Sequence, residues 1–370
     1  MVAGDPALTS CEASPRSSLP IGLWLPNVWQ GAHPEWLAPG EAMSGGAVGG
    51  IEPLSSKGME AELQMMVSHV WKRMLRLVRP RLWWDRRLFD QPPRIVSTPW
   101  QAFPHSTTAR SHLFAVGDVH GCADLLLLLL THLCAQPHAD GTMRSIVFLG
   151  DLVDRGPGSI RSLHLAQGCA ERFDQAVILP GNHEAALLKA LDPADDGSSF
   201  RLWLEKGGDT ALKEIGAQHL PVPEQRAAVR EALPVGTEEQ LRATPGHLWD
   251  GDLLFVHAGI DPYSDRTAFL AQGLEDVTPG LDHWSTIREP FLNWRGGWDG
   301  GGAPGPTLVV HGHSPVTKSR LTGLDRLLAR ANLSRSHARI NLDLGSTRSG
   351  TIGALEAAGG QYRIHVARYG

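Results

Sequence analysis

The chain is poor in three features that would each assign it to a particular class of protein. It has only 4 cysteines in 370 residues, too few for a disulfide-stabilised scaffold, and none shows a metal-binding spacing. The longest apolar run, Leu125–Leu130, falls far short of the roughly 18 residues of a membrane-spanning helix. The net charge of −5 argues against a surface built to bind nucleic acid. These absences predict a soluble, cytoplasmic protein with free thiols and no nucleic-acid partner.

The N-terminal part of the chain differs in composition from the rest. Residues 1–64 are rich in Gly, Pro, Ser and Ala and lack a secretory signal, which predicts a disordered extension and no export. Residues 65–110 form a basic, Trp-rich amphipathic segment or linker, with a net charge of +6 over residues 72–94 (eight basic residues, two acidic). This stretch can contact an anionic membrane weakly, pack on the next domain as a linker helix, or be translated sequence upstream of the true start. We expect a monomer whose catalytic domain spans residues 111–370.

From His112 onward, short β-rich runs alternate with helical stretches. Several runs are continuously apolar, as in strands that are covered on both faces, and their alternation with helices predicts a layered α/β domain. Between Phe200 and Gln240 helical patterns dominate, with Pro221 and Pro223 as breaks, which predicts a helical insertion over one sheet edge. The predicted strands are HLFAVG, SIVFLG, QAVILP, LLFVHA, TLVVHG, RINLDL, IGALE and YRIHVAR.

Five of the predicted strands end in a polar group of residues beside glycine. Ligand-binding side chains of open α/β sheets gather where strands end, so these groups are expected to converge in one cleft. Each has an ordinary explanation when taken singly, such as a turn, an ion-pair network, a helix cap or a core histidine. In chain order the groups are GDVHG (117–121), GDLVDRG (150–156), GNHE (181–184), HAG (257–259) and HGHS (311–314).

The residue types in these groups are those that bind divalent cations. Carboxylate, imidazole and amide ligands suit hard or borderline ions, and thiolates are absent from four of the five groups. Two cations about 3.5–4 Å apart need a shared ligand, normally a carboxylate. Asp151, at a strand end and preceded by glycine, is the natural bridge. The pattern therefore predicts a site for two metal ions.

In this order the five motifs resemble the signature of the phosphoprotein phosphatase branch of the calcineurin-like metallophosphoesterases, most closely the bacterial and phage-lambda type of serine/threonine protein phosphatase. Trp203 with GGDTALKEIG, WSTIREPFL and RINLDLGS is also similar to segments of that subgroup. The resemblance covers about residues 112–368. It implies an α/β sandwich of two β-sheets flanked by helices.

The resemblance also implies a role for each site residue. His183 would protonate the leaving group with Asp154 orienting it, and Arg155 and Arg288 would bind the phosphoryl oxygens. His311 is interpreted as a strand residue. The implied ligands are Asp118, His120 and Asp151 for one metal, and Asp151, Asn182, His257 and His313 for the other. The ions would be two divalent cations, expected to be Mn²⁺, with Fe and Zn as alternatives.

The implied reaction is hydrolysis of a phosphomonoester by direct attack of a metal-bridging hydroxide. We expect a serine/threonine protein phosphatase acting on phosphoproteins or phosphopeptides. The first alternative is a diadenosine tetraphosphate hydrolase or another small-molecule metallophosphoesterase, which shares the metal motifs. The second is a non-catalytic membrane-surface scaffold. It is disfavoured because all six metal positions and His183 carry the required residue types.

Overall fold

The computed structural model of the chain describes residues 92–278, 280–299, 307–317, 322–333 and 338–369. The predicted disordered extension (1–64) and residues 65–91 of the basic segment (65–110) lie outside the described residues.

The larger of the two sheets has seven strands in the order β1-β11-β10-β3-β4-β5, with β2 paired to β11. At one end of this sheet β3, β4 and β5 run parallel, with β5 at the edge, and the other strand pairs are antiparallel. The strands are β1 (Arg94–Ser97), β2 (Gln101–Ala102), β3 (Ser111–Val116), β4 (Met143–Phe148), β5 (Gln175–Ile178), β10 (Thr351–Ala358) and β11 (Gln361–Arg368).

The smaller sheet has four strands in the order β6-β7-β8-β9. The first pair is an antiparallel hairpin, and β7, β8 and β9 run parallel. The strands are β6 (His247–Asp250), β7 (Leu253–Val256), β8 (Leu308–His311) and β9 (Arg339–Asn341). His311 is the last residue of β8 and is fully buried, as its interpretation as a strand residue requires.

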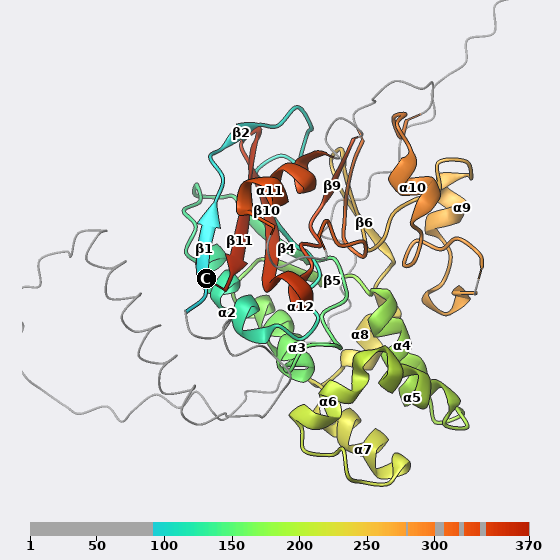
Figure 1. The fold of residues 1–370 in the computed structure, drawn as a ribbon. Coiled ribbons are helices and arrows are strands. Elements are labelled where there is room, and N and C mark those ends of the chain that lie inside the picture. The colour runs from blue at the N-terminus through green and yellow to red at the C-terminus, as the bar shows by residue number, and fades with distance from the viewer. Residues whose placement is uncertain (1–91, 279, 300–306, 318–321, 334–337, 370) are drawn as a thin grey trace, which may run out of the picture. The chain divides into compact units, whose positions relative to one another are not determined.

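The two sheets pack face to face across one apolar core, which confirms the predicted sandwich (Figure 1). Leu113 and Leu355 of the larger sheet meet Phe255 and Val310 of the smaller one in this core. All four side chains are fully buried. Their alternation along each strand leaves the opposite face of each sheet for the helices.

The helices cover the outer faces and one edge of the sandwich (Figure 1). The predicted helical insertion is confirmed, but Pro221 and Pro223 open α7 instead of only breaking a helix, since proline is tolerated in a first helical turn. The elements are α2 (Ala123–Cys134), α3 (Ser159–Gln167), η3 (Gly168–Glu171), α4 (Asn182–Leu191), α5 (Ser198–Trp203), η4 (Leu204–Gly208), α6 (Asp209–Glu214), α7 (Val222–Ala232), α8 (Thr237–Ala243), α9 (Arg266–Leu270), η5 (Leu274–Asp276), α10 (Glu289–Asn293), α11 (Leu324–Leu333) and α12 (Ser346–Ser349).

Two expectations drawn from composition can be compared with the described part of the chain. None of its helices is both long enough and apolar enough to cross a membrane. Cys122, Cys134 and Cys169 are free thiols, as predicted.

The larger sheet begins before residue 111, where the sequence placed the start of the domain. β1 pairs with β11 over residues 94–97, and Ser97 Oγ lies 2.7 Å from His365 Nδ1. Phe103 is buried in the core between the sheets. Strands of four and two residues are too short to show a clear alternation, so their pairing was not visible in the sequence.

This pairing predicts that removing residues 92–110 destabilises the domain. A chain beginning at Ser111 should have a lower melting temperature than one beginning at Pro92, because it leaves the edge of β11 unpaired and removes Phe103 from the core. Loss of one buried phenylalanine alone costs about 3–5 kcal/mol. Thermal unfolding of the two chains, followed by circular dichroism, measures the difference. Equal melting temperatures would show that residues 92–110 do not stabilise the sheet.

Candidate metal centre

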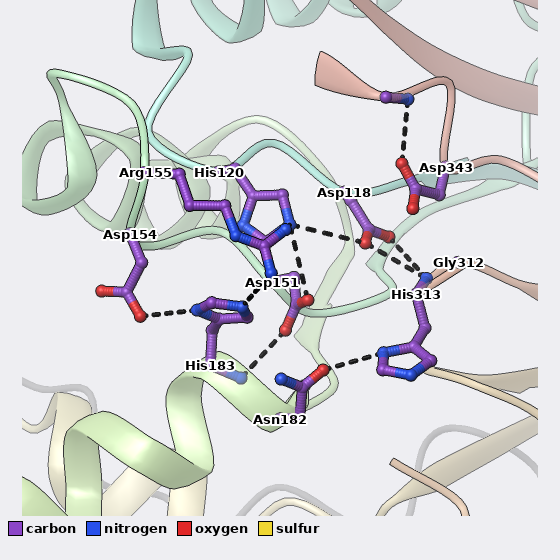
Figure 2. Close-up of polar contacts among 12 residues, drawn as sticks. Asp118, His120, Asp151, Asp154, Arg155, Asn182, His183, Gly312, His313 and Asp343 are labelled. Carbon is purple, nitrogen blue, oxygen red and sulfur yellow. Dashed lines mark hydrogen bonds and ion pairs between the residues drawn. The ribbon is translucent and has the colours of Figure 1, made fainter. Parts of the chain in front are cut away.

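The five predicted motifs meet where strands of both sheets end. β3, β4 and β5 deliver the first three motifs, and β7 and β8 deliver the last two. Figure 2 shows most of the polar side chains from these motifs facing one another in one cluster. Two overlapping groups have metal-binding geometry, His120 with Asp151 and His183, and Asp151 with His257 and His313. Asp151 belongs to both groups, as expected of a bridging ligand.

The first predicted ligand set, Asp118, His120 and Asp151, is almost completely buried. His120 Nδ1 donates to the Val153 carbonyl oxygen over 3.1 Å, so Nε2 carries the lone pair. Nε2 lies 3.6 Å from Asp151 Oδ2 and 3.9 Å from Asp118 Oδ2. A ring nitrogen with a lone pair beside two carboxylates is a donor set that suits a divalent cation.

The second predicted ligand set joins the two sheets. His257 Nδ1 donates to the Leu149 carbonyl oxygen over 2.7 Å, which turns Nε2 toward Asp151 Oδ1 and Asn182 Oδ1, each 3.3 Å away. His313 Nδ1 lies 2.8 Å from Asn182 Oδ1, whereas its buried Nε2 has no hydrogen-bond partner among the residues that the structure describes. Every predicted ligand of the second metal therefore presents a donor atom to one small region.

The electrostatics of the cluster demand positive charge. Burial alone would lower the pKa of His257, but the charge and hydrogen bond of Asp151, the charge of Asp118 and the hydrogen bond to Leu149 together raise this pKa to about 10. Burial lowers the pKa of His120 to about 3, so that ring is neutral and able to act as a ligand. Burial, followed by the charge of Asp343, raises the pKa of Asp118. The donor atoms fit divalent cations, which would compensate the buried carboxylates.

Close backbone approaches bring the ligands together. A Cβ atom on Gly181 would lie 2.3 Å from Asp151 Oδ1, and one on Gly312 would lie 2.0 Å from Asp118 Oδ1. Such distances are sterically forbidden, so only glycine fits at either position. The glycines beside the ligands thus permit the contacts expected of them.

The loop after β4 has an unusual backbone. Asp151, Asp154 and Arg155 have φ angles of 52°, 70° and 69°, a region that residues other than glycine rarely adopt. A strained conformation persists only where surrounding contacts impose it, and such positions cluster at functional sites. Contacts from other parts of the domain must therefore hold this loop in its conformation.

Glu184 supplies that restraint. Its fully buried carboxylate accepts hydrogen bonds from the backbone N–H groups of Asp151 (2.7 Å), Leu152 (2.8 Å), Val153 (3.3 Å) and Gly181 (2.8 Å). These four bonds tie the loop after β4 to the start of α4. The backbone N–H of His183 adds a bond to Asp151 Oδ1 over 3.0 Å.

His183 lies at the start of α4 within a chain of hydrogen bonds (Figure 2). Its Nδ1 donates to Asp154 Oδ2 over 2.6 Å, and Asp154 Oδ1 accepts from Trp203 Nε1 over 2.9 Å. Burial would lower the pKa of His183, but the charges of Asp151 and Asp154 outweigh burial and raise it. Arg155 Nη1 and Nη2 lie 2.7 Å from His120 Nε2 and His183 Nε2, respectively.

Arg288 precedes α10 at the edge of the cluster. Its guanidinium donates to Ser314 Oγ over 3.0 Å and to the His313 carbonyl oxygen over 3.4 Å. Arg288 forms no salt bridge with Glu289 or Asp282 in the described part of the chain, as an arginine on a solvent-exposed helix could. Nine of the ten predicted site residues are thus joined by contacts around Asp151, and Arg288 is joined to them through His313.

Sequence reasoning missed three residues that support the cluster. Glu184 belongs to the GNHE motif and Asp343 to the segment RINLDLGS, but neither motif assigns a role to these carboxylates. Trp203 is part of the family resemblance, but the sequence does not indicate which residue its indole contacts. Their partners lie far along the chain or are backbone groups, so no local spacing signals them. Asp343, buried beside Asp118, accepts from the Gly345 backbone N–H over 2.9 Å.

Comparison with known proteins identifies the family. The model of the calcineurin-like phosphoesterases matches residues 111–343, so the chain belongs to this family of metal-dependent phosphoesterases. It is 32% identical over 207 residues to serine/threonine-protein phosphatase 1 of Salmonella typhimurium, covering 56% of this chain and 80% of that protein. It is 24% identical over 253 residues to the asymmetrical bis(5'-nucleosyl)-tetraphosphatase PrpE of Halalkalibacterium halodurans, covering 65% and 87%.

Among solved structures, the chain is similar to the cold-active protein-tyrosine phosphatase of a psychrophilic Shewanella species. The sequence identity is 18%, the coverage is 71% of this chain and 80% of that chain, and the TM-score is 0.39.

The four bonds of Glu184 lead to a prediction. Glu184→Gln should lower the free energy of unfolding by about 3 kcal/mol, because the amide NH₂ would face backbone N–H donors where an ionised oxygen now accepts them. Because the same bonds hold Asp151, metal affinity should fall as well. Chemical denaturation and calorimetric metal titration measure the two effects.

Glu214→Gln is the matched control. Glu214 accepts from the backbone N–H groups of Ile160 and Arg161 at the start of α3, over 2.9 and 3.0 Å. This variant should lose stability and keep its metal affinity. Equal loss of metal affinity in the two variants would contradict the role given to Glu184.

Proposed function

We propose that this chain is a dinuclear-metal phosphomonoesterase, specifically a serine/threonine protein phosphatase. The observation that carries the proposal is the convergence of the five other predicted metal ligands around Asp151, beside a buried His183–Asp154 pair. This arrangement combines a site for cations with a proton donor, as hydrolysis of a phosphate ester requires.

The ligands would divide as the sequence motifs suggest, with Asp118, His120 and Asp151 on one ion and Asp151, Asn182, His257 and His313 on the other. Bound divalent ions would act as Lewis acids toward the phosphoryl group and would activate water. The mixture of imidazole, amide and carboxylate donors favours Mn²⁺, Fe or Zn over Mg²⁺, which prefers oxygen ligands.

The remaining residues would bind the substrate and move its proton. His183, held by Asp154, would protonate the leaving alkoxide from Nε2. Arg155 and Arg288 would donate hydrogen bonds to the phosphoryl oxygens, a task that suits the planar guanidinium. Because Arg155 Nη2 now donates to His183 Nε2, a phosphoryl group that accepts from Arg155 would free this nitrogen to carry the proton.

Similarity is divided between a protein phosphatase and the first alternative. Serine/threonine-protein phosphatase 1 of Salmonella typhimurium and the symmetrical bis(5'-nucleosyl)-tetraphosphatase of Dechloromonas aromatica are each 32% identical, over 207 and 191 residues. The segment WSTIREPFL, which resembles the phosphatase subgroup, favours the protein phosphatase. The longer match to PrpE keeps hydrolysis of diadenosine tetraphosphate as the second candidate. We further propose a cytoplasmic monomer, in keeping with the free thiols.

A substrate panel tests the proposal. The Mn²⁺-loaded protein should hydrolyse phosphoserine and phosphothreonine peptides with a higher kcat/KM than p-nitrophenyl phosphate or diadenosine tetraphosphate. A preference for diadenosine tetraphosphate would support the second candidate. Absence of hydrolysis with every substrate and with Mn²⁺, Fe²⁺ and Zn²⁺ would contradict both and favour a non-catalytic role.

Two substitutions separate metal binding from proton transfer. Asp151→Asn should abolish activity and reduce the binding of both ions. His183→Gln should lower kcat by about 10²–10⁴-fold, as expected for a lost general acid, with metal content unchanged. Metal analysis of the purified variants decides between the roles. Loss of an ion in His183→Gln would make His183 a ligand, as its grouping with His120 and Asp151 allows.

A further inference from the structure

The helical insertion contacts the loop after β4 directly at two points. Trp203, the last residue of α5, donates from Nε1 to Asp154 Oδ1 over 2.9 Å. Gly207 in η4 accepts from the backbone N–H of Arg155 through its carbonyl oxygen over 3.0 Å. Asp154 and Arg155 both have positive φ angles, 70° and 69°. The insertion therefore fixes both a side chain and the backbone of this loop.

The bond from Trp203 decides how the Asp154 carboxylate is oriented. Asp154 is fully buried, and its Oδ2 accepts from His183 Nδ1 over 2.6 Å. With one oxygen held by Trp203 and the other by His183, the carboxylate cannot rotate. Without the indole N–H, Oδ1 would be a buried acceptor that has lost the one side-chain donor it has among the described residues. Rotation of the carboxylate would then no longer be opposed.

The indole itself has little freedom to move. Trp203 is 1% exposed, and its ring packs on Phe200 with centroids 5.4 Å apart. A Cβ atom at Gly208 would lie 2.2 Å from the ring, so the backbone of η4 closes directly over it. The fold thus directs one N–H donor at one carboxylate oxygen.

We propose that Trp203 is a positioning residue for the proton transfer to the leaving group, acting through Asp154 on His183. The proposal rests on the proposed phosphatase function. Trp203 binds Asp154, and within the described residues its indole forms no hydrogen bond with a predicted metal ligand. Its loss should impair protonation of the leaving group and leave metal binding intact.

Leaving-group dependence tests this role. p-Nitrophenolate leaves readily without a proton, whereas the more basic phenolate depends more strongly on protonation. An impaired general acid therefore slows the hydrolysis of phenyl phosphate more than that of p-nitrophenyl phosphate. Trp203→Phe keeps an aromatic ring and removes the N–H. With Mn²⁺, its kcat should fall about tenfold more on phenyl phosphate than on p-nitrophenyl phosphate. Equal falls on both substrates, or none, would overturn the proposal.

Trp284→Phe is the matched control. Trp284 is also 1% exposed and donates from Nε1, over 2.8 Å, to the Gln272 carbonyl oxygen, outside the cluster. This variant should show equal changes on the two substrates. If Trp203→Phe does not fold, Gly208→Ala, which pushes the indole aside, should give the same selective loss. The absence of selectivity there would equally overturn the proposal.

A readout independent of activity separates this inference from the proposed function. In the ¹H NMR spectrum of ¹⁵N-histidine-labelled protein, the His183 Nδ1–H bonded to Asp154 should resonate far downfield. It should shift or broaden in Trp203→Phe and stay in place in Trp284→Phe. An unchanged signal would refute the positioning role even if the protein hydrolysed no phosphomonoester, whereas a shifted signal in an inactive protein would refute only the proposed function.

Discussion

The carboxylate of Glu184 holds the part of the molecule on which the candidate site depends. Asp151 is the residue that both candidate metal groups share. Its backbone has a left-handed conformation that residues other than glycine rarely adopt. Hydrogen bonds from four backbone N–H groups to one buried carboxylate stabilise this conformation. The cost of the strained loop is offset by a residue more than 30 positions further along the chain, in the first turn of α4.

The sandwich brings this loop to its partners. The larger sheet carries Asp118, Asp151 and the start of α4, and the smaller sheet carries His257 and His313. Neither sheet has a complete site, because the second ligand set takes members from both. The apolar core between the sheets therefore sets the distances among the ligands, and packing and chemistry are linked through the same strands.

Much of this arrangement could be predicted from the sequence. The continuous apolar strands that end in charge and glycine, such as SIVFLGD, predicted both the parallel strands and the ligands at their ends. β1 and β2 could not be predicted, since their pairing with β11 joins residues more than 250 positions apart. The supports of the site leave no local pattern, because Glu184 binds backbone N–H groups 31 to 33 positions away and Trp203 binds Asp154, 49 positions away.

The candidate site depends most on one carboxylate, that of Asp151, which would be a ligand of both metal ions. Anomalous diffraction from crystals of the Mn²⁺-loaded protein measures this most directly. The account predicts two anomalous peaks about 3.5–4 Å apart, both in contact with Asp151, one beside Asp118 and His120 and the other beside Asn182, His257 and His313. A single peak, or two peaks that do not share Asp151, would contradict it.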